Sequence, residues 1–90
     1  MFLAKVKGNV VSTQKDPKFI GTKLLIVECI DKEGNTFGEP LVAIDTIGAG
    51  INEIVLVVTG SGARYVDTTD RVIPSDASII GIVDTIEWSV

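Results

Sequence analysis

The fold is decided by a stretch that reads VAIDTIGAG at residues 42–50, INE at 51–53, IVLVVT at 54–59 and GSGAR at 60–64. It contains two apolar runs, and each leads into a turn that carries two glycines. The runs are too short for buried helices, and their isoleucine and valine content favours extended chain. Glycine lets the backbone turn sharply or pass close to a neighbouring segment. We therefore predict two strands, each followed by a turn suited to close backbone packing.

The composition extends this prediction to the whole chain. Valine and isoleucine supply 24 of the 90 residues, and 46% of the residues are hydrophobic against 22% charged. Such β-branched aliphatics favour an all-β domain with a minor helical part, and the length fits one domain over residues 1–90. A domain of this size has a modest core. The apolar surplus leaves two interpretations, a very hydrophobic monomer or an obligate oligomer that buries the excess between subunits, and we favour the oligomer.

The charge and the cysteine content argue against several classes of protein. The net charge of −4 argues against nucleic acid or an anionic membrane as a partner, because both bind basic surfaces. The one cysteine, Cys29, excludes an internal disulfide. The first residues lack the pattern of a signal peptide, and the longest apolar runs fall far short of a membrane span. We expect a cytoplasmic protein.

Alternation and turn residues divide the chain into short strands. Residues 23–30 are apolar on both faces except at Glu28, which suggests sheet closure or a subunit contact. Residues 31–40 read as a polar turn, with Pro40 at an edge or at a strand entry. Residues 61–66 are predicted to form a short helical turn that Ser61 caps. Five predicted strands, at residues 2–11, 23–30, 41–45, 53–59 and 78–88, favour a small five-stranded OB-like β-barrel.

Residues suited to catalysis or metal binding are sparse. The chain has no histidine, and Cys29 is predicted to be a buried structural thiol within an apolar strand. Asp45 and Asp84 interrupt apolar strands, and a carboxylate pair serves acid–base chemistry when it is held roughly 5–9 Å apart. Such residues more often form interface salt bridges or mark strand ends. We predict no catalytic residues, no metal site, no cofactor and no enzymatic activity.

The turn at residues 60–64 is the better candidate for a binding site. It combines backbone N–H groups, a hydroxyl and the Arg64 guanidinium at a predicted helix start, which suits a small anion. The alternative, which we favour, is a capped turn in which Arg64 pairs with Asp45 or Asp84 across a subunit contact. Residues 48–50 do not fit a dinucleotide-binding loop, because Glu53 stands where its third glycine belongs and a strand follows.

Two motifs at a fixed separation carry a family resemblance. They are DTIGAG at residues 45–50 and GSGAR at 60–64, accompanied by LAKVKGNVVST at 3–13, KLLIV at 23–27, VLV at 55–57 and IGIVD at 80–84. With them the chain resembles, nearly from end to end, the pentameric vertex proteins of bacterial microcompartment shells, the ethanolamine-utilisation and carboxysome vertex family. Family members usually carry a serine where this chain has Gly62, a change that adds flexibility to the turn.

The resemblance implies an OB-like barrel that assembles into a cyclic homopentamer. Such pentamers close the vertices of a polyhedral shell beside hexameric or trimeric shell proteins, a structural role without catalytic residues. A cyclic pentamer joins two different patches of the same chain. Our hypothesis places Asp45, Gly48, Gly50, Ser61, Ala63 and Arg64 at or near that contact. The rival function is an OB-like module that binds a small ligand or an oligonucleotide, which the negative charge and the scattered aromatics oppose.

Overall fold

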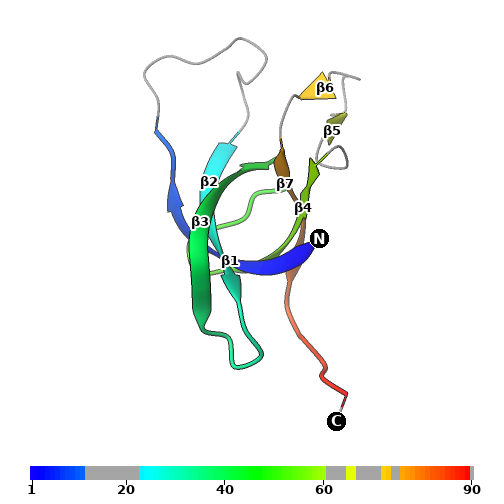
Figure 1. Ribbon diagram of the computed structural model, residues 1–90. Coiled ribbons are helices and arrows are strands. Elements are labelled where there is room, and N and C mark those ends of the chain that lie inside the picture. Colours follow the sequence, from blue (N-terminus) through cyan, green and yellow to red (C-terminus); the bar gives the residue numbers. More distant parts are fainter. Residues whose placement is uncertain (12–22, 61–64, 67–71, 74–75, 90) are drawn as a thin grey trace.

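Five strands of the chain form a closed barrel, drawn as a ring in Figure 1. The structure is a computed structural model and describes residues 1–11, 23–60, 65–66, 72–73 and 76–89. The barrel order is β1-β2-β3-β7-β4, and β5 and β6 form a separate two-stranded sheet. The all-β class and the five-stranded barrel are therefore confirmed. The strands are β1 (Phe2–Asn9), β2 (Lys23–Ile30), β3 (Thr36–Asp45), β4 (Ile54–Thr59), β5 (Tyr65–Val66), β6 (Val72–Ile73) and β7 (Ala77–Val83).

Long antiparallel ladders make up most of the barrel wall. Strand β1 pairs with β2 on one side and with β4 on the other, and β4 continues to β7. The ring is closed by a short parallel contact between β3 and β7, where Ile44 lies opposite Ser78 and Asp45 opposite Ile79. Because this contact comes at the end of β3, it places Asp45 and the loop that follows it at the closing seam.

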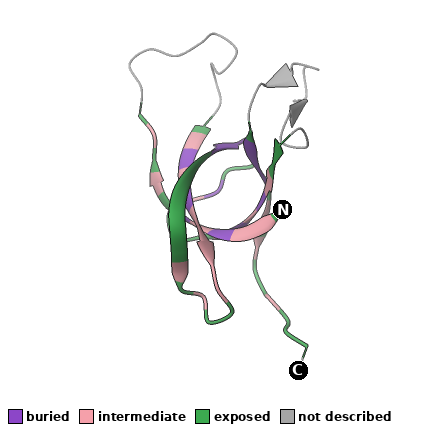
Figure 2. Cartoon of the chain, in the orientation of Figure 1, coloured by how far each residue is buried: buried purple, intermediate pink, exposed green. Residues whose placement is uncertain are grey.

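The core fills the inside of the ring with small and medium aliphatic side chains. Strand side chains alternate between two faces, so every second residue points inward. Figure 2 shows buried residues on the strands around the ring, whereas β3 is exposed over most of its length. The predicted apolar character of β2 is confirmed on its inner face, where Leu25 and Val27 are buried. The buried cluster comprises Ala4, Val6, Leu25, Val27, Ala43, Ala49, Val55, Val57, Ala77 and Ile79.

Strand β3 begins earlier than the sequence suggested. We predicted a strand from residue 41 after a polar turn over 31–40, but β3 starts at Thr36, which lies opposite Ile30 of β2. The turn is confined to residues 31–35 because the Asp31 carboxylate accepts the N–H groups of Glu33 and Asn35 at 3.0 and 2.9 Å. Pro40 is accommodated beside the register shift between Val27 and Cys29 of β2, a place where a strand tolerates proline.

Cys29 is half-buried, so the prediction of a buried thiol was wrong. It lies opposite Phe37 of β3, and Phe37 is itself exposed. Since its neighbour does not cover it, the thiol keeps some contact with solvent although it sits in an apolar strand.

The last strand is shorter than predicted. Strand β7 ends at Val83, whereas the sequence pattern continued to Trp88. Val83 lies opposite Ile54, the first residue of β4, so the ladder has no further partner residue in β4. Residues 84–89 continue as a tail that leaves the barrel (Figure 1).

The helical turn predicted for residues 61–66 is not confirmed. Residues 61–64 lie outside the described part of the chain, and Tyr65–Val66 form strand β5, which pairs with Val72–Ile73. Tyrosine and valine favour extended chain, so a pairing partner outweighs the weak helix signal here. Within the described residues, no helix has the length and hydropathy to cross a membrane.

Candidate subunit interface

The loop after β3 is organised by the carboxylate of Asp45. Oδ1 accepts the N–H groups of Ile47 and Gly48 at 3.0 and 3.2 Å, and Oδ2 accepts that of Ala49 at 2.8 Å. An aspartate that bonds its own backbone two to four residues on makes a tight turn, and the negative charge strengthens each bond. Asp45 is only 2% exposed. The buried carboxylate therefore holds the loop by using its acceptor sites inside its own subunit.

Lys23 supports the same loop from the neighbouring strand. It lies opposite Asp45 in the β2–β3 register. Its Nζ atom is 4.0 Å from Asp45 Oδ2 and donates a hydrogen bond of 3.1 Å to the carbonyl of Ala49. The Lys23 side chain is about half exposed, so the ion pair is screened and contributes at most about 1 kcal/mol. Its main effect is to fix the position of the Ala49 carbonyl.

Two glycines in this loop have different structural roles. Gly48 has a φ of 91°, a backbone conformation that other residues adopt at a cost. The N–H of Gly50 donates to Glu53 Oε1 at 2.6 Å, and a Cβ atom at Gly50 would lie 3.2 Å from that oxygen. Gly48 is therefore favoured by its backbone conformation, whereas a Cβ atom at Gly50 would require only a small shift of the Glu53 side chain.

The end of the loop is joined to β1 by two backbone hydrogen bonds. The N–H of Asn52 donates to the Val6 carbonyl at 2.8 Å, and the N–H of Val6 donates to the Glu53 carbonyl at 3.0 Å. With the Asp45 bonds, these contacts fix both ends of residues 46–53 against the barrel. A loop held in this way presents its outward side chains at defined positions.

Two of those outward side chains are apolar. Ile47 and Ile51 are 42% and 48% exposed, whereas the third apolar side chain of the loop, Ala49, is buried in the core. Further large apolar side chains are exposed on β3 and β7, among them Val42, Ile80 and Ile82. Apolar surface gathered in patches is typical of an interaction site. This is the surplus that the composition indicated, and it lies on the outside of the barrel.

The described residues were compared with the requirements of a metal site. No group of three or more histidine, cysteine, aspartate or glutamate side chains in the described ranges could hold a metal ion. The loop at residues 46–53 offers a rigid, partly apolar surface instead.

The comparison with known proteins decides the family. Residues 1–84 match the model of the family described as ethanolamine utilisation protein EutN/carboxysome. The chain belongs to this family. It is 47% identical over 87 residues to the carboxysome shell vertex protein CcmL of Synechococcus elongatus, covering 96% of this chain and 86% of that protein.

Solved structures of the EutN/carboxysome family share the fold. The GrpN pentameric microcompartment shell protein of Rhodospirillum rubrum is 43% identical and superposes with a TM-score of 0.82 over the whole of both chains. CcmL of Gloeobacter violaceus is 42% identical with a TM-score of 0.86, covering 98% of this chain and 90% of that one. The resemblance that the sequence motifs indicated is confirmed.

The structure brings together three of the six predicted interface residues. Asp45, Gly48 and Gly50 lie in the one loop described above. The sequence suggested that Asp45 either forms an interface salt bridge or marks the end of a strand. In the structure Asp45 ends β3, and its carboxylate accepts hydrogen bonds from its own loop. Ser61, Ala63 and Arg64 lie outside the described residues, as does Gly62, so their part in a contact of the EutN/carboxysome type stays a prediction.

Sequence reasoning missed two features: the free tail after β7, and a groove lined by Pro40, Leu41, Val42, Thr59, Gly60, Asp76 and Ala77. The groove was missed because its lining comes from three strands that lie far apart in the sequence, and because Pro40 was assigned to a turn. The tail was missed because the alternation of Ile86 and Trp88 reads as a strand. Both errors concern which segment pairs with a strand, and the residue pattern of one segment does not contain this information.

Proposed function

We propose that this chain is a structural subunit of a bacterial microcompartment shell, and that five copies form the closed ring at a shell vertex. The observation that carries the proposal is the full-length similarity to GrpN, a pentameric microcompartment shell protein. Two relatives are shell vertex proteins by name, CcmL of S. elongatus and PduN of Salmonella typhimurium, and the latter is 44% identical to this chain. The chain is not an enzyme, and its site of action is the shell of an organelle in the cytoplasm.

The surface of the barrel supports this function. A ring of identical subunits needs two different patches that fit each other, and obligate contacts are apolar. The loop at residues 46–53 offers one patch, since it is held rigidly and exposes Ile47 and Ile51. We place the subunit contact at this loop, with Asp45, Gly48 and Gly50 shaping it and with Ser61, Ala63 and Arg64 contributing from the following turn.

The partners of the ring follow from its place in the shell. We propose that it contacts hexameric or trimeric shell proteins along its outer edge. A binding module for oligonucleotides is not favoured, because the net charge is −4 and the relatives CcmL and GrpN are shell components.

The mass of the assembly in solution tests the proposal. Native mass spectrometry and light scattering are expected to give five times the 9.6 kDa chain mass. Changing Ile47 and Ile51 together to serine removes apolar contact area without disturbing the buried core, so the ring is expected to dissociate into folded subunits. Arg64→Ala is expected to weaken it as well.

A matched control uses Val11→Ser, which removes an apolar side chain that is 91% exposed, two residues beyond the end of β1 and outside the loop. This variant should keep the pentamer. A lone, well-folded subunit for the unmodified protein at high concentration would refute the proposal. A stable pentamer in the Ile47 and Ile51 double variant would refute the placement of the contact.

A further inference from the structure

The tail at residues 84–89 has the pattern of a strand and no strand to pair with. Ile86 and Trp88 alternate with Thr85, Glu87 and Ser89, which is the period of a half-buried strand. Within the described residues the tail makes no hydrogen bond to the barrel, and Trp88 is 53% exposed. A large aromatic side chain in this position gains more from burial than any other residue of the tail.

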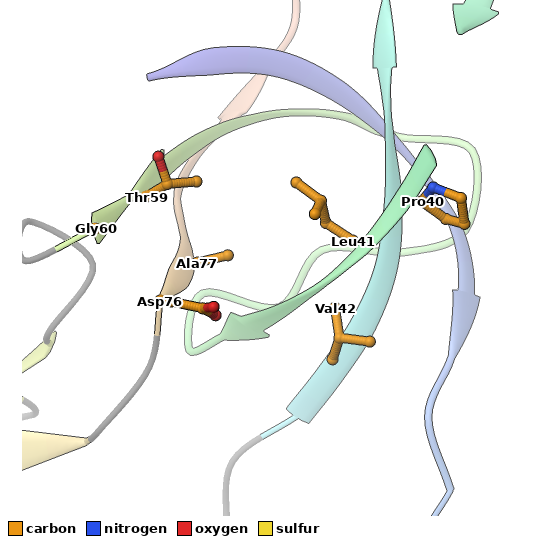
Figure 3. Close-up of a pocket in the computed structure, with 7 residues that line it drawn as sticks. All are labelled: Pro40, Leu41, Val42, Thr59, Gly60, Asp76 and Ala77. Atoms are coloured by element: carbon orange, nitrogen blue, oxygen red, sulfur yellow. The ribbon is translucent and has the colours of Figure 1, made fainter. Parts of the chain in front are cut away.

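A groove on the barrel has the size and chemistry to receive a large side chain. It has a volume of about 500 Å³ and lies between β3, the end of β4 and the start of β7. Figure 3 shows Leu41 pointing across it towards Thr59 and Ala77. Its lining mixes the apolar side chains of Pro40, Leu41, Val42 and Ala77 with the Thr59 hydroxyl and the Asp76 carboxylate, and this carboxylate makes no hydrogen bond within the described part of the chain.

The strand edge beside the groove is open. Strand β3 pairs with β7 only at Ile44 and Asp45 among the described residues, so residues 36–43 have no described strand partner on that side. Of these, Pro40, Leu41 and Val42 line the groove, and Pro40 offers a carbonyl but no N–H. Such an edge is a template for an added strand, unless it is covered. Leu41 and Val42 on this edge are 39% and 49% exposed, which adds apolar surface to the backbone groups.

We propose that the tail of each subunit lies along the β3 edge of the next subunit in the ring, with Trp88 in the groove. The inference rests on the proposed pentamer and names the segments that meet. Tryptophan has a large apolar body and a single N–H donor, and the groove offers apolar side chains together with acceptors that include the Asp76 carboxylate. Repeated around a ring, the contact joins two different surfaces of the same chain, as cyclic symmetry requires.

The length of the tail fits this placement. Six extended residues span about 20 Å at roughly 3.3 Å per residue. The chain measures 45 × 25 × 20 Å, so the span of the tail is comparable to the shortest of these extents. Because the tail leaves its own barrel (Figure 1), its apolar residues are presented to a neighbour.

The fluorescence of Trp88 tests the proposal directly, because this is the one tryptophan in the chain. In the assembled ring its emission should be shifted to shorter wavelength and protected from acrylamide. In the dissociated Ile47 and Ile51 double variant it should be exposed. A pentamer whose tryptophan is exposed would overturn the tail placement and leave the proposed function intact. Protection in the dissociated subunit would show that the tail fills its own groove, which also overturns it.

A crosslinking experiment identifies the two surfaces. In a Cys29→Ser background, one chain carries Ser89→Cys and a second, size-tagged chain carries Thr59→Cys beside the groove. After co-assembly, a short bismaleimide is expected to join tagged to untagged chains. Replacing Thr59→Cys by Glu33→Cys, in the exposed β2–β3 turn, is the control. Equal crosslinking of the two pairs would contradict the assignment.

Truncating the side chain measures its contribution. Trp88→Ala is expected to weaken each subunit contact roughly thirtyfold, the loss typical of a tryptophan at the centre of an interface. Trp88→Phe keeps the apolar contact and loses the N–H donor, so it should weaken the contact less. If Trp88→Ala rings dissociate at the same protein concentration as the unmodified protein, the groove does not hold the tryptophan.

Discussion

The Asp45 side chain shows why one short carboxylate shapes the loop at the closing seam. Three backbone N–H groups need acceptors where β3 ends, and the two oxygens of an aspartate reach all of them from one position. A longer side chain would place its oxygens farther from the backbone. The neighbouring glycine supplies the turn that brings the third N–H group into range. Residue type and backbone conformation are therefore coupled at this position.

Replacing this carboxylate should destabilise the subunit markedly. Asp45→Ala leaves three N–H groups without their acceptor, so we expect the free energy of unfolding to fall by about 2–4 kcal/mol. Urea denaturation of the dissociated subunit, in the Ile47 and Ile51 background, measures this without a contribution from assembly. Asp45→Asn keeps one oxygen for Ile47 and Gly48 and should lose less. An equal loss in both variants would mean that the charge, and not the hydrogen bonds, stabilises the loop.

At the scale of the elements, the length of each strand is set by its neighbours. Strand β3 extends to Thr36 because β2 extends to Ile30, and β7 stops at Val83 because β4 begins at Ile54. Strand β2 pairs with β1 and β3 along its two edges, but its two faces lie in different surroundings. The inner face fills the barrel, and the outer face is half-buried at Leu24 and Ile26.

The two faces of β2 should respond differently to truncation. Leu25 is fully buried in the barrel core, so Leu25→Ala should lower the free energy of unfolding by about 2–5 kcal/mol. Leu24 is its half-buried neighbour on the opposite face, and Leu24→Ala should cost clearly less. Chemical denaturation of both variants provides the comparison. A cost at Leu24 that equals the cost at Leu25 would show that the outer face is packed as tightly as the core.

At the scale of the whole molecule, a small barrel with a large apolar exterior depends on its copies. A chain of 90 residues buries only about 60–65% of its unfolded surface, so the isolated subunit is modestly stable. Assembly adds stability through mass action, because the ring forms only from folded subunits. The exposed isoleucines of the loop and of β7 are the surface that this assembly would bury.

This dependence predicts unfolding that varies with concentration. For the unmodified protein, the melting temperature measured by calorimetry or circular dichroism should rise as the protein concentration rises. The Ile47 and Ile51 double variant, which is expected to stay dissociated, should melt at a temperature independent of concentration. A concentration-independent transition in the unmodified protein would show that the ring adds nothing to folding.

The sequence alone determined the fold class, the number of barrel strands and the family. Strand periodicity and β-branched content are local properties, and Gly48 and Gly60 follow shortly after the ends of β3 and β4. The DTIGAG and GSGAR motifs carried the family, and in the first of them the Asp45 carboxylate and the positive φ of Gly48 tolerate few other residues. The absence of histidine and the negative charge are properties of composition, and they argue against catalysis and nucleic-acid binding whatever the fold.

Only the tertiary structure decided where each strand ends and which surfaces stay open. The start of β3 at Thr36 and the end of β7 at Val83 depend on the strand opposite, which lies far away in the sequence. The surroundings of two side chains were decided in the same way. The Asp45 carboxylate is occupied by its own loop and is not left for a partner, and Cys29 stays half-exposed opposite Phe37. The residue pattern of a segment shows whether that segment favours a strand. Its hydrogen-bond partners, and the side chains that shield it from solvent, come from other segments that meet it only when the barrel closes.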